Sequence, residues 1–183
     1  MSFIFKKLSI PDIILVEPKV FSDERGFFME SFRNSIFKKN GINTNFIQDS
    51  LSHSKKGILR GLHFQKNPKA QAKIVTVVRG EIFDVAVDIR KNSPTYGKWI
   101  SEILSGHNHK SLYIPEGFAH GFCSLTDNSL IHYKMTNYRD TKLEKGIIWN
   151  DKSIKIKWPV KKPIISIKDK NNMTFNQYIN TYE

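Results

Sequence analysis

The sequence predicts an all-β fold, either a β-sandwich or a β-barrel. The dominant hydrophobic period is two, and turn signals such as 92–94 separate short apolar runs. In the clearest run, residues 81–90, the apolar side chains at 83, 85, 87 and 89 share one face. Asp84, Asp88 and Arg90 share the other face. About ten short strands at this spacing are typical of sandwiches and barrels.

The other expected elements follow in chain order. Further strands are predicted at 13–17, 26–32, 46–50, 58–65, 74–78, 99–104, 111–114, 118–124, 130–136 and 146–149. The best helix candidate is 34–40, which Gly41 would end. The stretch after Pro163 has no clear period, and we expect it to wrap the body of the fold. No repeat or linker divides the chain, which predicts a single domain over residues 1–183.

Composition excludes several classes of protein. With 183 residues, of which 39% are hydrophobic, the chain can bury a core and is not a disordered protein. The longest apolar runs, such as 13–16, are too short to span a membrane, and the first residues do not resemble a signal peptide. The single cysteine, Cys123, excludes an internal disulfide and a multi-cysteine zinc site. We therefore expect a cytoplasmic protein with no membrane partner.

The net charge of +12 favours an anionic partner without choosing one. The densest basic stretch, 152–162, alternates lysine with Ile and Trp, which a solvent-exposed strand face explains as well as a nucleic-acid patch does. The sequence has no Gly-rich nucleotide loop, no Gly-x-Ser-x-Gly and no aromatic RNA-binding signature. We therefore expect no nucleic-acid partner.

Four segments carry polar residues of catalytic type among apolar strand residues: 25–30, 60–73, 114–122 and 132–138. Each alone is ordinary, because a strand histidine such as His63 is more often structural. Together they supply a histidine base, a lysine that can hold an enolate oxygen, a tyrosine that can return a proton, and arginines that can bind a diphosphate. These residue types suit proton transfer next to a carbonyl.

One pattern, Pro115-x-Gly117-x-x-His120, resembles the second half of the cupin signature. This resemblance implies a cupin-like jelly-roll β-barrel with short peripheral helices and N- and C-terminal extensions. In metal cupins the first half supplies His-x-His and a glutamate. Here Phe64 and Gln65 follow His63, and the nearby Lys73 would repel a divalent cation. We therefore expect no metal and no cofactor. The alternative interpretation is a metal-dependent cupin enzyme that binds its metal through His63, Gln65 and His120.

The segments in combination resemble the dTDP-4-dehydrorhamnose 3,5-epimerase family. Matching stretches are 17–21, 23–28, 60–65, 83–90, 114–122 and 149–151, in family order over nearly the whole chain. The resemblance implies cofactor-independent epimerisation at C3 and C5 of a nucleotide-diphospho-4-keto-6-deoxy sugar. The implied reaction converts dTDP-4-dehydro-6-deoxy-D-glucose into dTDP-4-dehydro-L-rhamnose. It also implies a homodimer with strands shared across the interface.

The same resemblance implies roles for individual residues. His63 would remove the C3 and C5 protons, which the C4 ketone acidifies, and Asp169 would orient His63. Lys73 would stabilise the enolate, and Tyr133 would reprotonate the opposite face. The implied substrate contacts are Phe21, Arg25, Glu30, Gln48, Ser50, Arg60, Asp84, His120, Tyr138, Glu144 and Lys168, with Tyr138 stacking on the nucleotide base and Asp84 lying beside His120. Many family members have Asn where Ser50 stands and Tyr where Arg139 stands, and the resemblance puts both positions near the expected base pocket.

Some alternatives stay open at this point. Strict alternation puts Arg60 and His63 on opposite faces of one strand. Either a bulge at Gly61 brings both inward, or Arg60 reaches the ligand of a neighbouring subunit. The alternative functions are an epimerase acting on a single carbon or on a GDP-linked 4-keto sugar, and a β-barrel that binds nucleic acid or a sugar nucleotide without activity.

Overall fold

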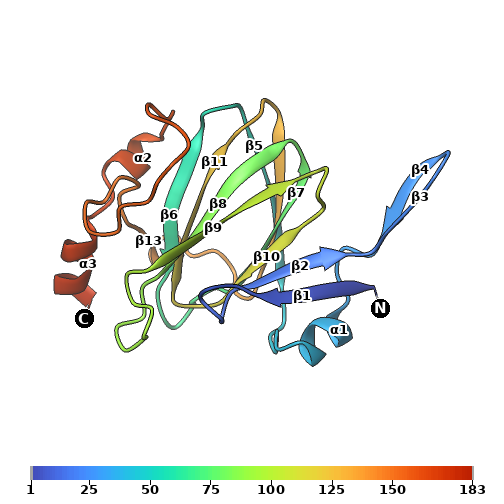
Figure 1. Cartoon of the computed structure of the whole chain (residues 1–183). Helices are drawn as coiled ribbons and strands as arrows, with labels where there is room; N and C mark the ends of the chain where they lie inside the picture. Colours follow the sequence, from blue (N-terminus) through green and yellow to red (C-terminus); the bar gives the residue numbers. More distant parts are fainter. Residues whose placement is uncertain (1, 183) are drawn as a thin grey trace.

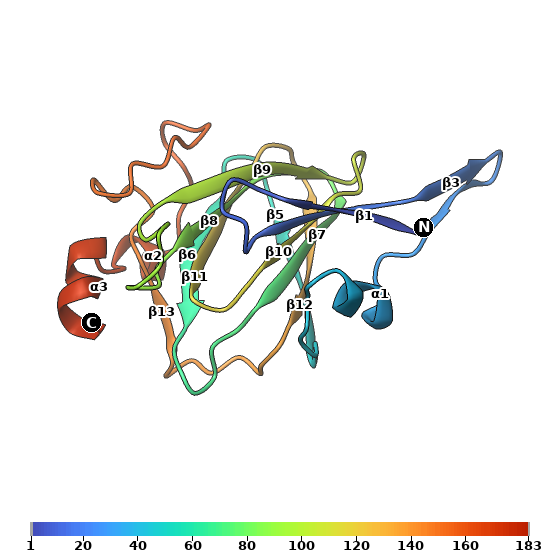
Figure 2. The same cartoon turned by 60° about the horizontal axis from the view of Figure 1, so that its bottom comes forward.

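The computed structural model describes residues 2–182, which form two facing β-sheets (Figure 1). The strand order is β1-β2-β10-β7-β12-β5 in the six-stranded sheet and β13-β6-β11-β8-β9 in the five-stranded sheet. A separate hairpin, β3-β4, extends from one end of the molecule, and the C-terminal helices lie at the other end in both views (Figure 2). The all-β, jelly-roll prediction is confirmed.

The bounds of the elements are as follows. The six-stranded sheet contains β1 (Phe3–Lys7), β2 (Ile14–Pro18), β10 (Ser111–Ile114), β7 (Lys73–Arg79), β12 (Ser129–Met135) and β5 (Gln48–Ser54). The five-stranded sheet contains β13 (Glu144–Gly146), β6 (Leu59–Gln65), β11 (Phe118–Ser124), β8 (Glu81–Asp88) and β9 (Trp99–Ser105). The hairpin is β3 (Val20–Asp23) with β4 (Gly26–Met29), and the helices are α1 (Asn34–Lys39), α2 (Ile167–Lys170) and α3 (Phe175–Tyr182).

The main core lies between the two sheets. Val75 and Ile131 of the six-stranded sheet pack there with Ile82 and Phe122 of the five-stranded sheet. A second core covers the outer face of the five-stranded sheet, where the side chains at 85, 87 and 89 pack against Phe175 and other residues of the C-terminal segment. Both faces of β8 are therefore buried, and Asp84 lies on the face that points between the sheets.

Several expected elements differ from those observed. The strand predicted at 46–50 is β5 at 48–54, the one at 26–32 ends at Met29, and the one at 146–149 is β13 at 144–146. Strands β1 and β3 were not predicted. After Pro163, where the sequence shows no clear period, the chain forms the short helices α2 and α3. None of the helices among residues 2–182 is long and apolar enough to cross a membrane.

The β3-β4 hairpin, residues 20–29 and called the arm below, is exposed on both faces. The exposed fractions of Phe21, Phe27 and Phe28 are 53%, 57% and 70%. Within the chain, the Phe27 ring packs against His109, with ring centroids 4.7 Å apart. Large apolar side chains exposed together are unusual on a monomer and are typical of a surface that another protein covers.

Candidate active site

A cavity of about 380 Å³ opens between the two sheets. Strands from both sheets line it, as does the loop that follows β12. The lining residues are Gln48, Ser50, Leu51, Ser52, Arg60, His63, Phe64, Gln65, Gln71, Lys73, His120, Phe122, Tyr133, Met135, Arg139 and Glu144. The cavity thus brings together eight of the predicted site residues from distant parts of the sequence.

His63 and Asp169 form a close polar pair in the wall of this cavity. The distance between His63 Nε2 and Asp169 Oδ1 is 2.6 Å. Asp169 stands in the short helix α2, where its backbone N–H donates to the Ser166 hydroxyl at 3.0 Å, and it is only 3% exposed. Burial favours the protonated form of the Asp169 carboxyl, but the hydrogen bonds from His63 and the Gly61 N–H outweigh it and lower the pKa. A carboxylate in this place fixes the tautomer of the imidazole and stabilises the imidazolium.

A local irregularity of β6 turns Arg60 and His63 toward the same cavity. In the pairing with β11, His63 faces His120 but Arg60 faces Phe122, and the register shifts between them. Gly61 lies in this shift with φ +133°, and its backbone packs closely against Gly121. A Cβ on Gly61 would lie only 2.5 Å from the Gly121 Cα, so there is no room for a side chain. Two glycines therefore permit the bulge, and Arg60 lines the cavity of its own chain.

His120 lines the cavity and forms a second polar pair with Asp84, which is fully buried. His120 Nε2 lies 2.8 Å from Asp84 Oδ1, and both residues are buried. The strands that carry them, β11 and β8, are neighbours in the five-stranded sheet. The predicted placement of Asp84 beside His120 is confirmed.

Tyr133 faces the cavity from the six-stranded sheet, opposite the sheet that carries His63. Its hydroxyl lies 3.0 Å from the Ser52 hydroxyl on β5, and its ring meets His120 edge to face at 6.4 Å between centroids. Burial raises the pKa of Tyr133 well above its usual value, and the Ser52 hydrogen bond only partly offsets this. The phenol therefore keeps its proton at neutral pH.

Lys73, at the start of β7, also lines the cavity. Burial lowers the pKa of its ammonium to about 8, although the negative charges of Glu144 and Asp84 favour the protonated form. At neutral pH the group is still a cation. A cation in a partly dry cavity can stabilise negative charge that develops on a substrate oxygen.

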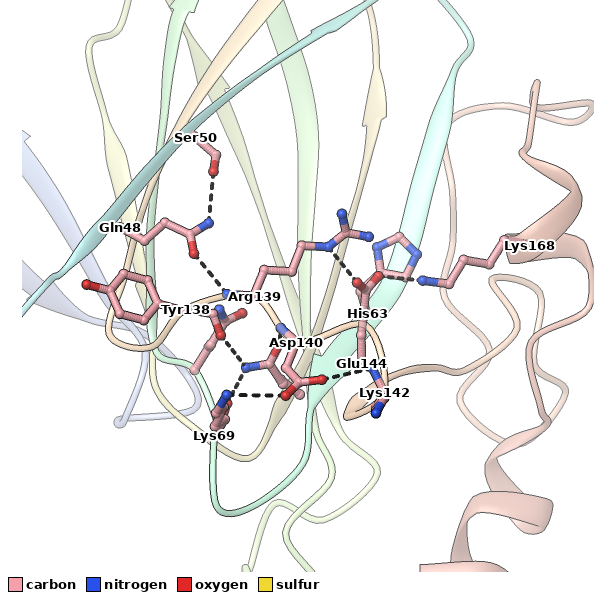
Figure 3. A network of polar contacts seen from close by, with 12 residues as sticks. Gln48, Ser50, His63, Lys69, Tyr138, Arg139, Asp140, Lys142, Glu144 and Lys168 are labelled. Atoms are coloured by element: carbon pink, nitrogen blue, oxygen red, sulfur yellow. Dashed lines mark hydrogen bonds and ion pairs between the residues drawn. The ribbon is translucent and has the colours of Figure 1, made fainter.

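Three charged side chains meet at the mouth of the cavity (Figure 3). The Glu144 carboxylate accepts a hydrogen bond from Arg139 Nε at 2.7 Å through one oxygen and from Lys168 Nζ at 2.6 Å through the other. Burial would raise the pKa of Glu144, but these two cations lower it below its usual value. Lys168 does not line the cavity itself and reaches its edge from α2. Figure 3 shows the His63 ring beside this group.

The loop after β12 is held in place by glutamine side chains. Gln65 Nε2 donates to the Tyr138 carbonyl at 3.0 Å, and Gln65 Oε1 accepts from the Asp140 N–H at 2.8 Å. Gln48 Oε1 accepts from the Arg139 N–H at 2.8 Å, and Gln48 Nε2 donates to the Ser50 hydroxyl at 3.2 Å. The Tyr138 ring extends in the opposite direction from the Arg139 side chain (Figure 3), does not line the cavity and is 63% exposed.

Besides Tyr138 and Lys168, three more predicted substrate contacts lie outside the cavity of this chain: Phe21, Arg25 and Glu30. Phe21 and Arg25 stand on the arm, where Arg25 pairs with Asp23 at 2.5 Å. Glu30 follows the arm and pairs with Arg33. Their role in binding substrate stays a prediction.

The cavity also contains residues to which the sequence patterns assigned no role. Among them are Ser52, Gln71 and Arg139. Ser52 could have been found, because the alternation of β5 puts it on the same face as Gln48 and Ser50. For Arg139, which lies in a loop, the signal was only its departure from the tyrosine of many family members near the expected base pocket. Within residues 2–182, no group of three or more His, Cys, Asp or Glu side chains is arranged to hold a metal ion.

Comparison with known proteins assigns the chain to a family. A family model described as dTDP-4-dehydrorhamnose 3,5-epimerase matches residues 7–177. The chain belongs to this family. A dTDP-4-dehydrorhamnose 3,5-epimerase of Shigella flexneri is 55% identical over 170 residues, which are 92% of this chain and 94% of the relative. The predicted family and the predicted class of enzyme, an epimerase and so an isomerase, are confirmed.

Solved structures of 3,5-epimerases share the fold. The enzyme of Bacillus anthracis, with TDP and PPi bound, has a TM-score of 0.92 and 44% identity, covering 94% of this chain and 99% of its own. The dTDP-6-deoxy-D-glucose-3,5-epimerase of Legionella pneumophila, in complex with dTDP-4-keto-L-rhamnose, has a TM-score of 0.92 and 43% identity, covering 95% and 93%. The likeness therefore covers nearly the whole chain.

Proposed function

We propose that this chain epimerises C3 and C5 of dTDP-4-dehydro-6-deoxy-D-glucose and releases dTDP-4-dehydro-L-rhamnose. The observation that carries the proposal is the opposition of two groups across one cavity. The His63–Asp169 pair stands on the five-stranded sheet side, and Tyr133 stands on the six-stranded sheet. Inversion at a carbon requires that a proton leave from one face and arrive at the other, and this arrangement supplies a base and an acid on opposite sides.

The proposed steps use only side chains of the cavity. The nitrogen of His63 that does not face Asp169 removes the proton from a carbon next to the C4 ketone, and the bonding electrons pass to the ketone oxygen. The resulting enolate is stabilised by the Lys73 ammonium. Tyr133 donates its phenolic proton to the opposite face as the ketone re-forms. His63 then loses its proton to solvent and Tyr133 regains one, so the sugar changes configuration with no net gain of protons.

The charges around the cavity support a substrate that carries a diphosphate. Arg60 lines the cavity, where its guanidinium donates to the Ser54 hydroxyl at 3.1 Å and to the His53 carbonyl at 2.9 Å. Lys73 lies deeper, and Lys168 lies at the edge. Cations around a concave site attract anionic substrates and raise their local concentration.

We place the reaction in the cytoplasm, which is supported by the single cysteine, Cys123, being buried and free.

The arm supports the proposal that the enzyme works as a homodimer. Its exposed phenylalanines would be buried in an interface with a second chain. The predicted substrate contacts Phe21 and Arg25 also lie on the arm. A partner copy related by a two-fold axis would receive this arm and give its own in return. In such a dimer the arm of one chain would supply Phe21 and Arg25 to the cavity of the other.

The test is to incubate the protein with dTDP-4-dehydro-6-deoxy-D-glucose and to determine the configuration of the product by proton NMR. Inversion at both C3 and C5, lost in the His63→Ala variant, is the expected result. Inversion at one carbon only would make the protein a single-carbon epimerase. No conversion, even at high protein concentration, would contradict the dTDP substrate and would direct the assay to GDP-linked 4-keto sugars. Near-normal turnover by His63→Ala would contradict the assignment of the base.

A further inference from the structure

Arg139 is held in place from three directions although it lies in a loop. The Gln48 side chain accepts from its backbone N–H, and Gln65 binds the backbone on both sides of it, at Tyr138 and Asp140. The side chain is held by Glu144 through Nε. This loop therefore presents the guanidinium in a defined position at the mouth of the cavity, and little conformational freedom would be lost when it binds a ligand.

The guanidinium still has donors to offer. In the part of the chain that the structure describes, its only side-chain partner is Glu144, which it contacts through Nε. The terminal amino groups remain, and the side chain is 60% exposed. Lys168 contacts the other oxygen of the same carboxylate, and its side chain is 53% exposed. Two cations thus flank one carboxylate, which leaves one positive charge in excess at the edge of the cavity.

Such an arrangement suits an anion with several oxygens. A guanidinium has a rigid fork of donors that can bind a phosphate in bidentate fashion, while an ammonium contributes a point charge. Glu144 binds the Arg139 guanidinium and the Lys168 ammonium through different oxygens and so fixes the position of both cations. Because these cations neutralise its negative charge, Glu144 would not repel an incoming phosphate. The sequence placed Arg139 near the expected base pocket, as a departure from the tyrosine of many family members, and gave it no contact with phosphate.

We propose that Arg139 is a phosphate-binding residue, acting with Lys168 across Glu144 on the diphosphate of the nucleotide sugar. This inference rests on the proposed function, because it names the diphosphate of that substrate. It adds to that function a residue that grips the substrate at a distance from the reacting carbons. Loss of the residue should therefore weaken binding and raise KM while leaving kcat nearly unchanged.

The test measures dTDP binding by calorimetry for the wild-type protein and three variants. Arg139→Gln removes the charge and keeps most of the volume, Arg139→Lys keeps the charge, and Arg79→Gln is the matched control. Arg79 is an exposed arginine whose guanidinium donates to the Asn128 carbonyl at 3.2 Å, away from the cavity. Arg139→Gln should raise Kd about tenfold, Arg139→Lys only about threefold, and Arg79→Gln not measurably. The dependence of Kd on salt should also be weaker for Arg139→Gln than for the wild type.

Two results would overturn the assignment of Arg139 while leaving the proposed function intact. Either Arg139→Gln would bind dTDP as tightly as Arg79→Gln does, or Arg139→Lys would lose as much affinity as Arg139→Gln. The latter would mean that Arg139 shapes the loop and does not bind phosphate through its charge. A wild-type protein that neither binds dTDP nor converts the dTDP-linked sugar would instead contradict the proposed function and this inference with it.

Discussion

The Nε2 atom of His63 lies 2.6 Å from Oδ1 of Asp169, although 106 positions separate the two residues in the chain. One stands on β6 in the five-stranded sheet, and the other on a four-residue helix in the C-terminal segment that packs outside that sheet. The C-terminal segment therefore does more than cover the outer core, because it supplies the carboxylate that orients the proposed base.

Replacing Asp169 by Asn should cost activity more than stability. The hydrogen-bonded carboxylate has a pKa below its usual 3.8, so it is ionised throughout the neutral range and can stabilise an imidazolium. An amide of the same shape cannot, and it permits the wrong tautomer of His63. We expect kcat to fall by about 10²-fold or more with little change in KM. A variant that keeps wild-type kcat would show that the pair is only structural.

The Tyr133→Phe variant should separate proton removal from proton return. The buried phenol keeps its proton at neutral pH, as an acid must. Without the hydroxyl, His63 can still form the enolate, but reprotonation of the opposite face slows. Product formation should fall by about 10²-fold or more, whereas exchange of substrate protons with solvent should persist. Equal loss of exchange and product, measured by NMR in D2O, would argue against a role as acid only.

Lys73 should impose a limit on activity at alkaline pH. Its pKa of about 8 means that the ammonium is present below that pH and is lost above it, so enolate stabilisation should decline above pH 8. In Lys73→Arg the guanidinium stays charged, and the alkaline decline should move to higher pH even if kcat is lower. The measurement is the pH profile of kcat. An unchanged alkaline limb in Lys73→Arg would assign that limb to another group.

The close approach of Gly61 to Gly121 should make Gly61→Ala far more harmful than an alanine at an open glycine. The added Cβ would lie 2.5 Å from the Gly121 Cα, so β6 and β11 would have to separate. We expect a loss of about 3 kcal/mol in the free energy of unfolding, and a loss of activity because Arg60 and His63 would shift.

Gly57 provides the matched control for this comparison. It also has a positive φ, +78°, but a Cβ there would meet nothing within 4 Å. Gly57→Ala should therefore cost only the backbone strain, about 1 kcal/mol, and should keep activity. Equal losses for the two variants in urea unfolding would show that the contact between the glycines is unimportant.

A charge on the arm should disrupt the proposed dimer. Phe28, 70% exposed in the single chain, would be buried against the partner, so Phe28→Asp should shift sedimentation toward the monomer and reduce activity. Ile164, which is 63% exposed in the C-terminal segment, is the control, and Ile164→Asp should leave the oligomeric state unchanged. A wild-type protein that sediments as a monomer at assay concentration would contradict this part of the proposal.

The period of two predicted much of the fold and one feature of the site. It placed most strands of the two sheets, and it put Asp84 on the face that meets His120. It gave only residues 48–50 of β5, because this strand presents Gln48, Ser50 and Ser52 to the cavity instead of apolar side chains. Leu51 also lines the cavity but is 65% exposed, so the strand has no buried apolar face. It also failed for β3, since a strand exposed on both faces shows no alternation.

Features of the site that depend on contacts between residues distant in sequence could not be predicted from patterns along the chain. The inward turn of Arg60 depends on contact between Gly61 and Gly121 on different strands, and alternation alone gave the opposite face. Asp169 lies in a segment without periodicity, and only the family resemblance pointed to it. The position of Arg139 depends on two glutamines that are far from it in the sequence. Gln48 accepts a hydrogen bond from the Arg139 N–H, and Gln65 donates one to the carbonyl of the preceding Tyr138.

The central claim is that one base and one acid on opposite sides of a single cavity act at two carbons. The most direct measurement is the mass and NMR spectrum of the dTDP-linked product formed by the wild-type protein in D2O. The account predicts one solvent deuterium at C3 and one at C5, each carbon with inverted configuration. Inverted product that carries no solvent deuterium would contradict it, because the protons would then not have passed through His63 and Tyr133.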